Sequence, residues 1–181
     1  MKALLLSLAL LLPLLPGQPA AESATDREHQ VKAVFLYNFA QFVEWPDSAF
    51  RDADTPLVVG ILGLDPFETY LDEVVKGEKV NNHEILVKRF KRIEDVDYCH
   101  VLFVSDSEAP RLLQTLGVLK QRHILTVGES KAFSLQGGMV SFVTENGKIK
   151  LKVNLEAVQA AKLNVSSKLL RLAEIVKPDK E

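Results

Sequence analysis

The sequence predicts an α/β fold in which a small mixed sheet combines parallel strands with a C-terminal antiparallel hairpin, with helices on both faces. Three observations lead to this prediction. Two strand–helix–strand patterns follow one another between residues 57 and 128, and such units join parallel strands through right-handed crossovers. Their strands are continuous apolar runs, as in strands that are buried on both faces. Beyond residue 138, two alternating segments flank Asn146 and Gly147, a strong hairpin signal because both residues tolerate positive φ.

Composition favours one domain for this fold. The chain has 181 residues, of which 47% are apolar and 25% are charged, so it is long enough to bury a core without disulfides. We assign residues 25–178 to a single domain. The near balance of 22 basic and 24 acidic residues gives no reason to expect a nucleic-acid partner. Cys99 is the only cysteine, and its place in the strand-like segment DYCHVLFVS favours burial over intermolecular pairing.

The first 21 residues, MKALLLSLALLLPLLPGQPAA, have the pattern of a secretory signal peptide. Lys2 provides the basic start, an apolar stretch follows, and small residues suited to a signal peptidase come last. The apolar stretch is too short, and too interrupted by proline, to span a membrane. Cleavage fits between residues 20 and 23, after Ala20, Ala21 or Ser23. No later segment approaches the roughly 20 apolar residues of a transmembrane helix, so we expect an exported protein that is not embedded in a membrane.

The first element after this leader is a predicted helix over residues 25–45, which contains the aromatic-rich stretch FLYNFAQFVEWP. At about 100° per residue, four apolar side chains fall within about 80° of arc and would pack on the sheet: Val31, Phe35, Phe39 and Phe42. Tyr37 lies on the opposite, more polar face. Pro46 ends the helix, because proline disfavours the helical conformation in the residue before it.

The first strand–helix–strand unit follows a polar turn. The continuous apolar run over residues 57–62 is a buried strand. Asp65 is a good N-cap, and Pro66 then falls at the first helical position, where its missing N–H costs nothing. Gly77 closes the helix, and residues 81–90 alternate between apolar and polar side chains, which predicts the second strand.

The second unit repeats this scheme. Residues 100–104 form its first strand, and Ser105 with Glu108 fits a capping box for the helix that follows. A third buried strand, HILTVGES, ends at Gly128. The remaining elements are predicted to be strands 139–144 and 148–153, a short helix to Ala161 capped by Asn154, and a last helix over residues 168–176 capped by Ser166 or Ser167.

No sequence motif provides the groups of a catalytic or metal site. Gly60 and Gly63 follow a buried strand but lack the three-glycine spacing of a dinucleotide fingerprint. The four histidines make no i, i+4 pair and have no cysteine at a zinc spacing. Ser105 to Glu108 follows a predicted parallel strand, where open sheets bind ligands, but helix capping explains the same residues. We therefore expect no catalytic residues, no metal site and no cofactor.

A few polar and aromatic residues are candidates for binding. Asn38 lies within the apolar sector of the first helix, so its amide either bonds to a neighbouring loop or faces a pocket. Lys168 and Arg171 share one side of the predicted last helix, as a solvated edge or as cations above apolar walls. Together with Trp45, these residues would line a ligand pocket between the first and last helices. Tyr37 is the candidate for an exposed partner surface.

Six segments, in this order, resemble the YfiR family of exported bacterial regulators: VKAVFLYNFAQFVEWP, PLVVGILGLDPF, CHVLFVS, HILTVGES, GGMVSFVTENGKIKLKVNL and SSKLLRLAEIV. The resemblance implies a periplasmic, non-catalytic α/β domain, often dimeric. It also implies that the protein represses a membrane-bound diguanylate cyclase of the YfiN type through the periplasmic portion of the cyclase. Relief of repression by an outer-membrane lipoprotein of the YfiB type is implied as well, with the cyclic di-GMP level as the output.

The chain departs from the resembled family in its cysteines. The founding member carries several and depends on disulfides, so redox control through an internal bridge does not carry over to a chain that has Cys99 alone. Two hypotheses about function follow. The chain is a periplasmic repressor that acts by protein binding or, alternatively, a periplasmic sensor that binds a small aromatic or anionic ligand.

Overall fold

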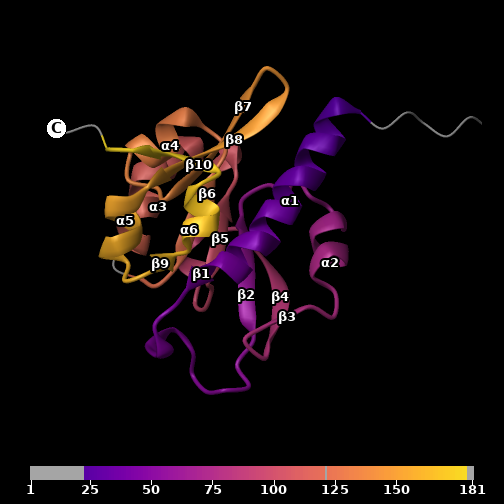
Figure 1. The fold of residues 1–181 in the computed structure, drawn as a ribbon, viewed down its shortest axis with the longest axis vertical. Coiled ribbons are helices and arrows are strands. Elements are labelled where there is room, and N and C mark those ends of the chain that lie inside the picture. Colours follow the sequence, from indigo (N-terminus) through magenta and orange to yellow (C-terminus); the bar gives the residue numbers. More distant parts are fainter. Residues whose placement is uncertain (1–22, 121, 179–181) are drawn as a thin grey trace, which may run out of the picture.

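The computed structural model describes residues 23–120 and 122–178, and the predicted signal peptide lies outside these residues. An eight-stranded sheet forms the centre of the fold (Figure 1), with the strand order β10-β8-β7-β6-β5-β2-β4-β3. Its strands are β2 (Leu57–Leu62), β3 (Lys79–Val80), β4 (His83–Phe90), β5 (Val101–Val104), β6 (Leu125–Gly128), β7 (Val140–Glu145), β8 (Lys148–Asn154) and β10 (Ala173–Val176). Strands β4, β2, β5, β6 and β7 are parallel, and β8 is antiparallel to β7.

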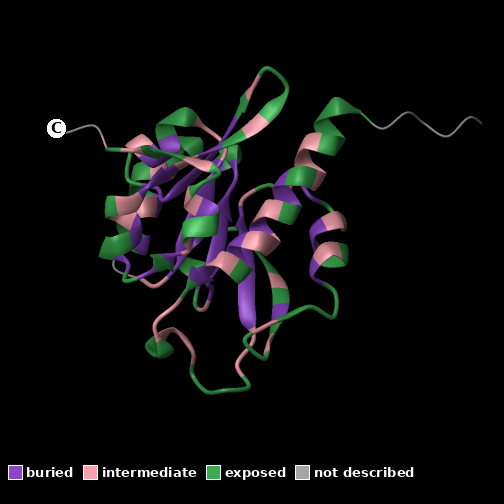
Figure 2. Ribbon diagram, in the orientation of Figure 1, coloured by how far each residue is buried: buried purple, intermediate pink, exposed green. Residues whose placement is uncertain are grey.

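Helices cover both faces of this sheet. They are α1 (Ala24–Phe42), α2 (Tyr70–Val75), α3 (Leu112–Leu119), α4 (Lys131–Leu135), α5 (Leu155–Ala160) and α6 (Ser167–Leu170). Alternate residues of β2 point to opposite sides: Val59 belongs to the apolar cluster beneath α1, α2 and α6, whereas Val58 belongs to the cluster beneath α3 and α4. Figure 2 shows the strands as the most buried part of the molecule. The predicted fold class is therefore confirmed.

Local turn chemistry explains both hairpins of the sheet. Asn146 and Gly147 have φ values of 52° and 71°, which is the conformation that the predicted β7–β8 hairpin requires. A second hairpin, between β3 and β4, turns at Asn81 and Asn82 with φ values of 49° and 70°. Asparagine adopts such angles more readily than most residues. Residues 81–90 were predicted as a single strand, and the first two form this turn instead.

The first helix ends earlier than predicted. It stops at Phe42, and Val43 and Glu44 form the short strand β1, which pairs with β9 (Asn164–Val165). The backbone N–H of Ser166 donates to the Phe42 carbonyl at 2.8 Å. Tertiary pairing therefore replaces the last helical turn before Pro46.

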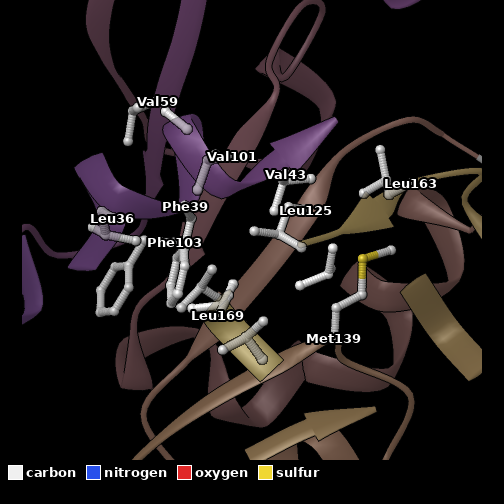
Figure 3. Close-up of a cluster of buried hydrophobic side chains, with 14 of the residues drawn as sticks. Leu36, Phe39, Val43, Val59, Val101, Phe103, Leu125, Met139, Leu163 and Leu169 are labelled. Carbon is white, nitrogen blue, oxygen red and sulfur yellow. The ribbon is translucent and has the colours of Figure 1, made fainter. Parts of the chain in front are cut away.

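The buried face of α1 is also rotated from the predicted one. Ala33, Leu36 and Phe39 are completely buried, whereas 46% of Val31 is exposed. Small residues let the helix backbone approach the sheet closely, which turns Val31 outwards. Figure 3 shows Leu36 and Phe39 pointing into the cluster of side chains from the sheet. Phe35 is half-buried, and its ring lies 5.9 Å from that of Phe142 on β7.

The predicted N-cap Asp65 does not begin a helix, because α2 starts only at Tyr70. One carboxylate oxygen of Asp65 accepts the N–H of Phe67 at 2.7 Å. The other pairs with Nε of Arg89, also at 2.7 Å. The cation on the neighbouring strand thus holds Asp65 in a turn.

The predicted capping box at Ser105 is wrong in its second half. Ser105 does cap, but the element is a 3-10 helix (Asp106–Arg111), and α3 begins only at Leu112. Glu108 does not reach back to Ser105, because its carboxylate pairs with Arg111 at 2.8 Å.

The predicted last helix over residues 168–176 is wrong in its second half. Helix α6 has a single turn, and Ala173–Val176 form β10, which adds a parallel strand to β8. An exposed sheet edge offers unpaired backbone groups, and the β-branched pair at the end of this segment suits a strand better than a helix. Leu169 of α6 is buried, while 69% of Leu172, which follows the helix, is exposed.

Candidate functional site

Five rings close the amino ends of the parallel strands, and we call them the amino-end stack: Trp45, Phe50, His83, Tyr98 and His100. The Phe50 ring lies between two imidazoles, with its centroid 4.1 Å from His83 and 4.5 Å from His100. Trp45 and Tyr98 meet His100 edge-on, at 5.7 and 4.9 Å. The segment that carries Phe50 joins β1 to β2 and extends beyond the end of the sheet (Figure 1).

His100 is the fully buried centre of this stack. Its Nδ1 accepts the backbone N–H of Val58 at 3.0 Å, so the proton of the neutral ring is on Nε2, which donates to the Tyr98 hydroxyl oxygen at 3.2 Å. Burial lowers the pKa of His100 to about 4. The ring is therefore neutral near pH 7, and it holds the loop to the sheet.

A cavity of about 400 Å³ lies beside the stack. Trp45, Phe50 and His83 supply aromatic walls, and Glu44 and Asp47 add two carboxylates. Glu44 also accepts a hydrogen bond from the Asn164 amide at 2.9 Å. Aromatic faces next to carboxylates suit a flat or cationic group.

The residues predicted for a ligand pocket do not all meet in this cavity. Trp45 lines it, but Asn38, Lys168 and Arg171 do not. Asn38 is half-buried on α1, and both cations are exposed on or directly after α6. Helix α6 does lie against α1, through Leu169 (Figure 3).

Tyr37 ties α1 to the connection after α2. Its hydroxyl donates to Glu78 at 2.7 Å and accepts from the Gln41 amide at 2.5 Å. The hydrogen bond to Glu78 raises the pKa of Tyr37. The ring edge therefore stays at the surface in a fixed orientation.

A second surface lies along the other end of α1, and we call it the helix–hairpin surface. It is a shallow hollow of about 580 Å³ between α1 and the β7–β8 hairpin. Its apolar part comes from Val31, Phe35 and Ile149, and Arg27 and Lys148 lie beside them. The adjacent Val34 is also 40% exposed. Val31 and Val34 are thus exposed to water, beside the half-buried Phe35 and Ile149.

A network of charges fixes this part of α1, and we call it the carboxyl-end clasp. The side chain of Lys32 is only 6% exposed, and its Nζ lies 2.7 Å from both Glu28 and Glu129. Thr144 on β7 donates to Glu28 at 2.8 Å. Burial would lower the pKa of Lys32, but its hydrogen bonds to Glu129 and Glu28 outweigh this and raise it. The clasp joins α1 to the end of β6 and to the hairpin.

The remaining chemical candidates have structural explanations. The Cys99 thiol is buried, as predicted, and donates to the Val101 carbonyl at 3.0 Å. Burial raises its pKa to about 12, so the thiolate is not available near pH 7. Beside Gly63, the Ser107 hydroxyl accepts the N–H of Leu64 at 3.0 Å, in the place where a dinucleotide phosphate would lie. Within residues 23–120 and 122–178, no three metal-binding side chains are grouped.

Sequence reasoning missed Phe50, His83 and Lys32 as parts of these sites. The rings of Phe50 and His83 are separated by 32 intervening positions and meet only through the packing of a loop on strand ends. Lys32 gave one usable signal, because Glu28 precedes it at i, i+4 spacing.

The described helices include none that is both long and apolar enough to cross a bilayer.

Comparison with solved structures finds a similar arrangement in an ABC domain in complex with L-Trp from Streptococcus pneumonia, with a TM-score of 0.49 and 10% sequence identity. The match covers 66% of this chain and spans 55% of that chain. No curated protein matches the sequence. The YfiR/HmsC-like family model, in contrast, matches residues 29–174, which include most of α1, the whole β2–β8 region and α6. The chain therefore belongs to the YfiR/HmsC-like family.

Proposed function

We propose that this chain is an exported periplasmic regulator of diguanylate cyclase signalling, and that it represses a YfiN-type cyclase by protein binding. Family membership supports the regulatory role. Repression would follow from binding more tightly to the inactive state of the cyclase, since a ligand shifts a conformational equilibrium only by its differential affinity for the two states. The proposal includes a homodimer, no catalytic activity, and relief by a YfiB-type outer-membrane lipoprotein.

The helix–hairpin surface is the observation that carries this proposal. Exposed apolar side chains that adjoin one another on a folded protein mark interaction sites more often than isolated ones do. Here Val31, Val34 and Phe35 stand on one helix next to Ile149 of the hairpin. The carboxyl-end clasp holds the helix in place, so little conformational entropy would be lost on binding.

Charges beside this surface define the partner's chemistry. Arg27 and Lys148 lie at the edge of the hollow, and Glu28 is paired within the clasp. An apolar segment that also carries acidic side chains would therefore fit best, because opposite charges at an interface rim speed association and fix orientation.

The test uses two valines of nearly equal exposure on opposite faces. Val31 on α1 is 46% exposed and Val118 on α3 is 48% exposed. In a strain that expresses the cyclase, deletion of the gene and Val31→Asp should both raise cyclic di-GMP and surface attachment, whereas Val118→Asp should behave as wild type. An unchanged cyclic di-GMP level in the deletion strain would refute repression. Equal effects of the two substitutions would refute this surface.

A second candidate function is small-molecule sensing, and the Trp45 cavity favours it. We infer two candidate sites: this cavity, whose carboxylates favour an aromatic or cationic ligand, and the pocket expected from the sequence beside α1 and α6, where Asn38, Lys168 and Arg171 would favour an anionic one. Trp45 is the only tryptophan, so its emission reports binding directly. Loss of the response in Asp47→Asn assigns the cavity, and loss in Arg171→Ala assigns the α1–α6 site. Flat titrations with aromatic, cationic and anionic compounds would refute sensing.

A further inference from the structure

A groove of about 470 Å³ lies between α3 and α5, at the amino ends of β6 and β7. Figure 1 shows these two helices beside each other, away from α1. Leu113, Leu116 and Gly117 form one wall, Ala157 and Ala160 form the other, and Met139 lies at the floor. Small-molecule sites in proteins have this size and this mostly apolar lining. The groove is separate from the helix–hairpin surface and from the Trp45 cavity.

Gly117 is the residue that singles out this groove. It lies inside α3, where glycine costs about 1 kcal/mol relative to alanine. Its φ is not positive, and a Cβ built on it would meet no atom within 4 Å. Neither backbone conformation nor close packing therefore requires glycine here. What glycine does provide is open space in the wall of the groove, opposite Ala160.

Polar groups in the groove show what kind of molecule would fit. Thr126 at the floor accepts the Met139 N–H at 3.1 Å. The amide of Asn154 donates to the Ser134 carbonyl at 2.9 Å and accepts the Ala157 N–H at 3.0 Å. Because these groups already have partners, the floor does not need a polar ligand.

The rim of the groove carries one charge of each sign. Lys120 and Glu156 both line it, and neither forms a salt bridge within the described part of the chain. Opposite charges give the rim no net attraction for an anion or for a cation. Selection must therefore come from shape and from apolar contact.

We propose that the α3–α5 groove binds a small uncharged apolar molecule, and that Gly117 keeps the groove open for it. The site is independent of the proposed repression of a cyclase. A neutral fluorescent probe, N-phenyl-1-naphthylamine, tests it directly on the mature protein. Its emission should rise with a saturable, one-to-one titration curve.

Matched substitutions locate the probe. Gly117→Leu and Ala160→Leu fill the groove from opposite walls, and each should weaken probe binding at least tenfold. Gly117→Ala, which adds a single methyl group, should weaken binding less than either leucine substitution, and Val118→Leu, which lies outside the lining, should stay within about threefold of wild type. Circular dichroism and thermal melting verify that each variant is folded. If one of the two leucine variants does not fold, the other still tests the groove.

Three outcomes would overturn the proposal. The first is a probe titration that does not saturate. The second is wild-type affinity in a folded Gly117→Leu or Ala160→Leu variant. The third is loss of probe binding in Trp45→Phe, a variant whose α3–α5 groove is unchanged. This result would place the probe in the Trp45 cavity.

Discussion

The two ends of the parallel strands are held by different kinds of interaction. At the amino ends, the rings of Trp45, Phe50 and Tyr98 pack against the buried His100. At the carboxyl ends, ion pairs dominate, with Lys32 between Glu28 and Glu129, and Arg89 between Asp65 and Asp72. Buried rings gain free energy by leaving water, whereas buried charges must first lose their hydration. We infer that the amino-end stack supplies stability, and that the carboxyl-end clasp mainly fixes the position of α1 and of the surface it carries.

The largest expected change in stability comes from His100→Ala, which tests the amino-end stack. It removes a fully buried ring and leaves the Val58 N–H without its acceptor, so the free energy of unfolding should fall by about 3 kcal/mol or more. Urea denaturation measures this change. His100→Asn retains an acceptor near the position of Nδ1 and should recover part of the loss. If His100→Ala unfolds like wild type, the stack does not stabilise the fold.

A slightly smaller effect on stability is expected when the pH is lowered, and it distinguishes the amino end of the sheet from the carboxyl end. Burial lowers the pKa of His100 from 6.5 to about 4, so in this window the unfolded chain binds a proton that the folded chain does not. The contribution of the neutral His100 ring to the free energy of unfolding is fully present above pH 6.5. It is lost as the pH falls towards 4, by about 3 kcal/mol in total.

The carboxyl end responds at lower pH. The hydrogen bond from Lys32 lowers the pKa of Glu28 below 4.5, so its contribution is present above pH 4.5 and is lost only as the pH falls further. Urea denaturation at a series of pH values should therefore show two successive losses of stability. His100→Asn should abolish the first loss and leave the second. A single loss confined to pH below 4.5 in the wild type would contradict the assignment to His100.

At the carboxyl end, Lys32→Met should cost about 2 kcal/mol, because it leaves two carboxylates close together without their cation. The cost stays below that of a fully buried pair, since Glu28 and Glu129 retain some contact with water. Adding Glu129→Gln to Lys32→Met should restore part of the stability, because it removes the repulsion. If the double variant is less stable than the single one, then charge pairing is not what the clasp contributes.

Lys32→Met should impair repression of the cyclase more than its loss of folding stability alone would explain. Once freed from the clasp, α1 can shift relative to the hairpin, and this would deform the helix–hairpin surface. In cells, the variant should raise cyclic di-GMP although most of the protein remains folded. Wild-type cyclic di-GMP with Lys32→Met would mean that the surface does not depend on the clasp.

The sequence allowed prediction of those elements whose signals are local. The apolar run of β2 and the Asn146–Gly147 turn specify their own structure, and both were predicted correctly. The segment Ala173–Val176 was predicted as helix, because its strand form comes from pairing with β8, a non-local interaction. The rotated face of α1 was missed for a similar reason, since the close approach of Ala33 to the sheet depends on the shape of the sheet.

The candidate site was harder to predict than the fold. Trp45 was predicted to line a pocket with Asn38, Lys168 and Arg171, whereas its neighbours in the structure, Phe50 and His83, come from separate segments that only tertiary packing brings together. The pocket expected between the first and last helices assumed a long last helix. That helix has one turn, so Lys168 lies on it and Arg171 directly after it.

The smallest expected effect concerns Tyr37, which lies on α1 between the two ends. Tyr37→Phe removes a partly exposed hydrogen bond to Glu78 and should lower the free energy of unfolding by only about 0.5–1 kcal/mol. Its effect on regulation is a separate measurement: if the hydroxyl contacts the partner, cyclic di-GMP should rise although the protein is as stable as wild type within this margin. Glu78→Gln, which keeps an acceptor for the hydroxyl, is the matched control. Wild-type cyclic di-GMP in Tyr37→Phe would restrict the partner surface to the apolar side chains near the carboxyl-end clasp, because the hydroxyl would then serve only to hold α1 to the connection after α2.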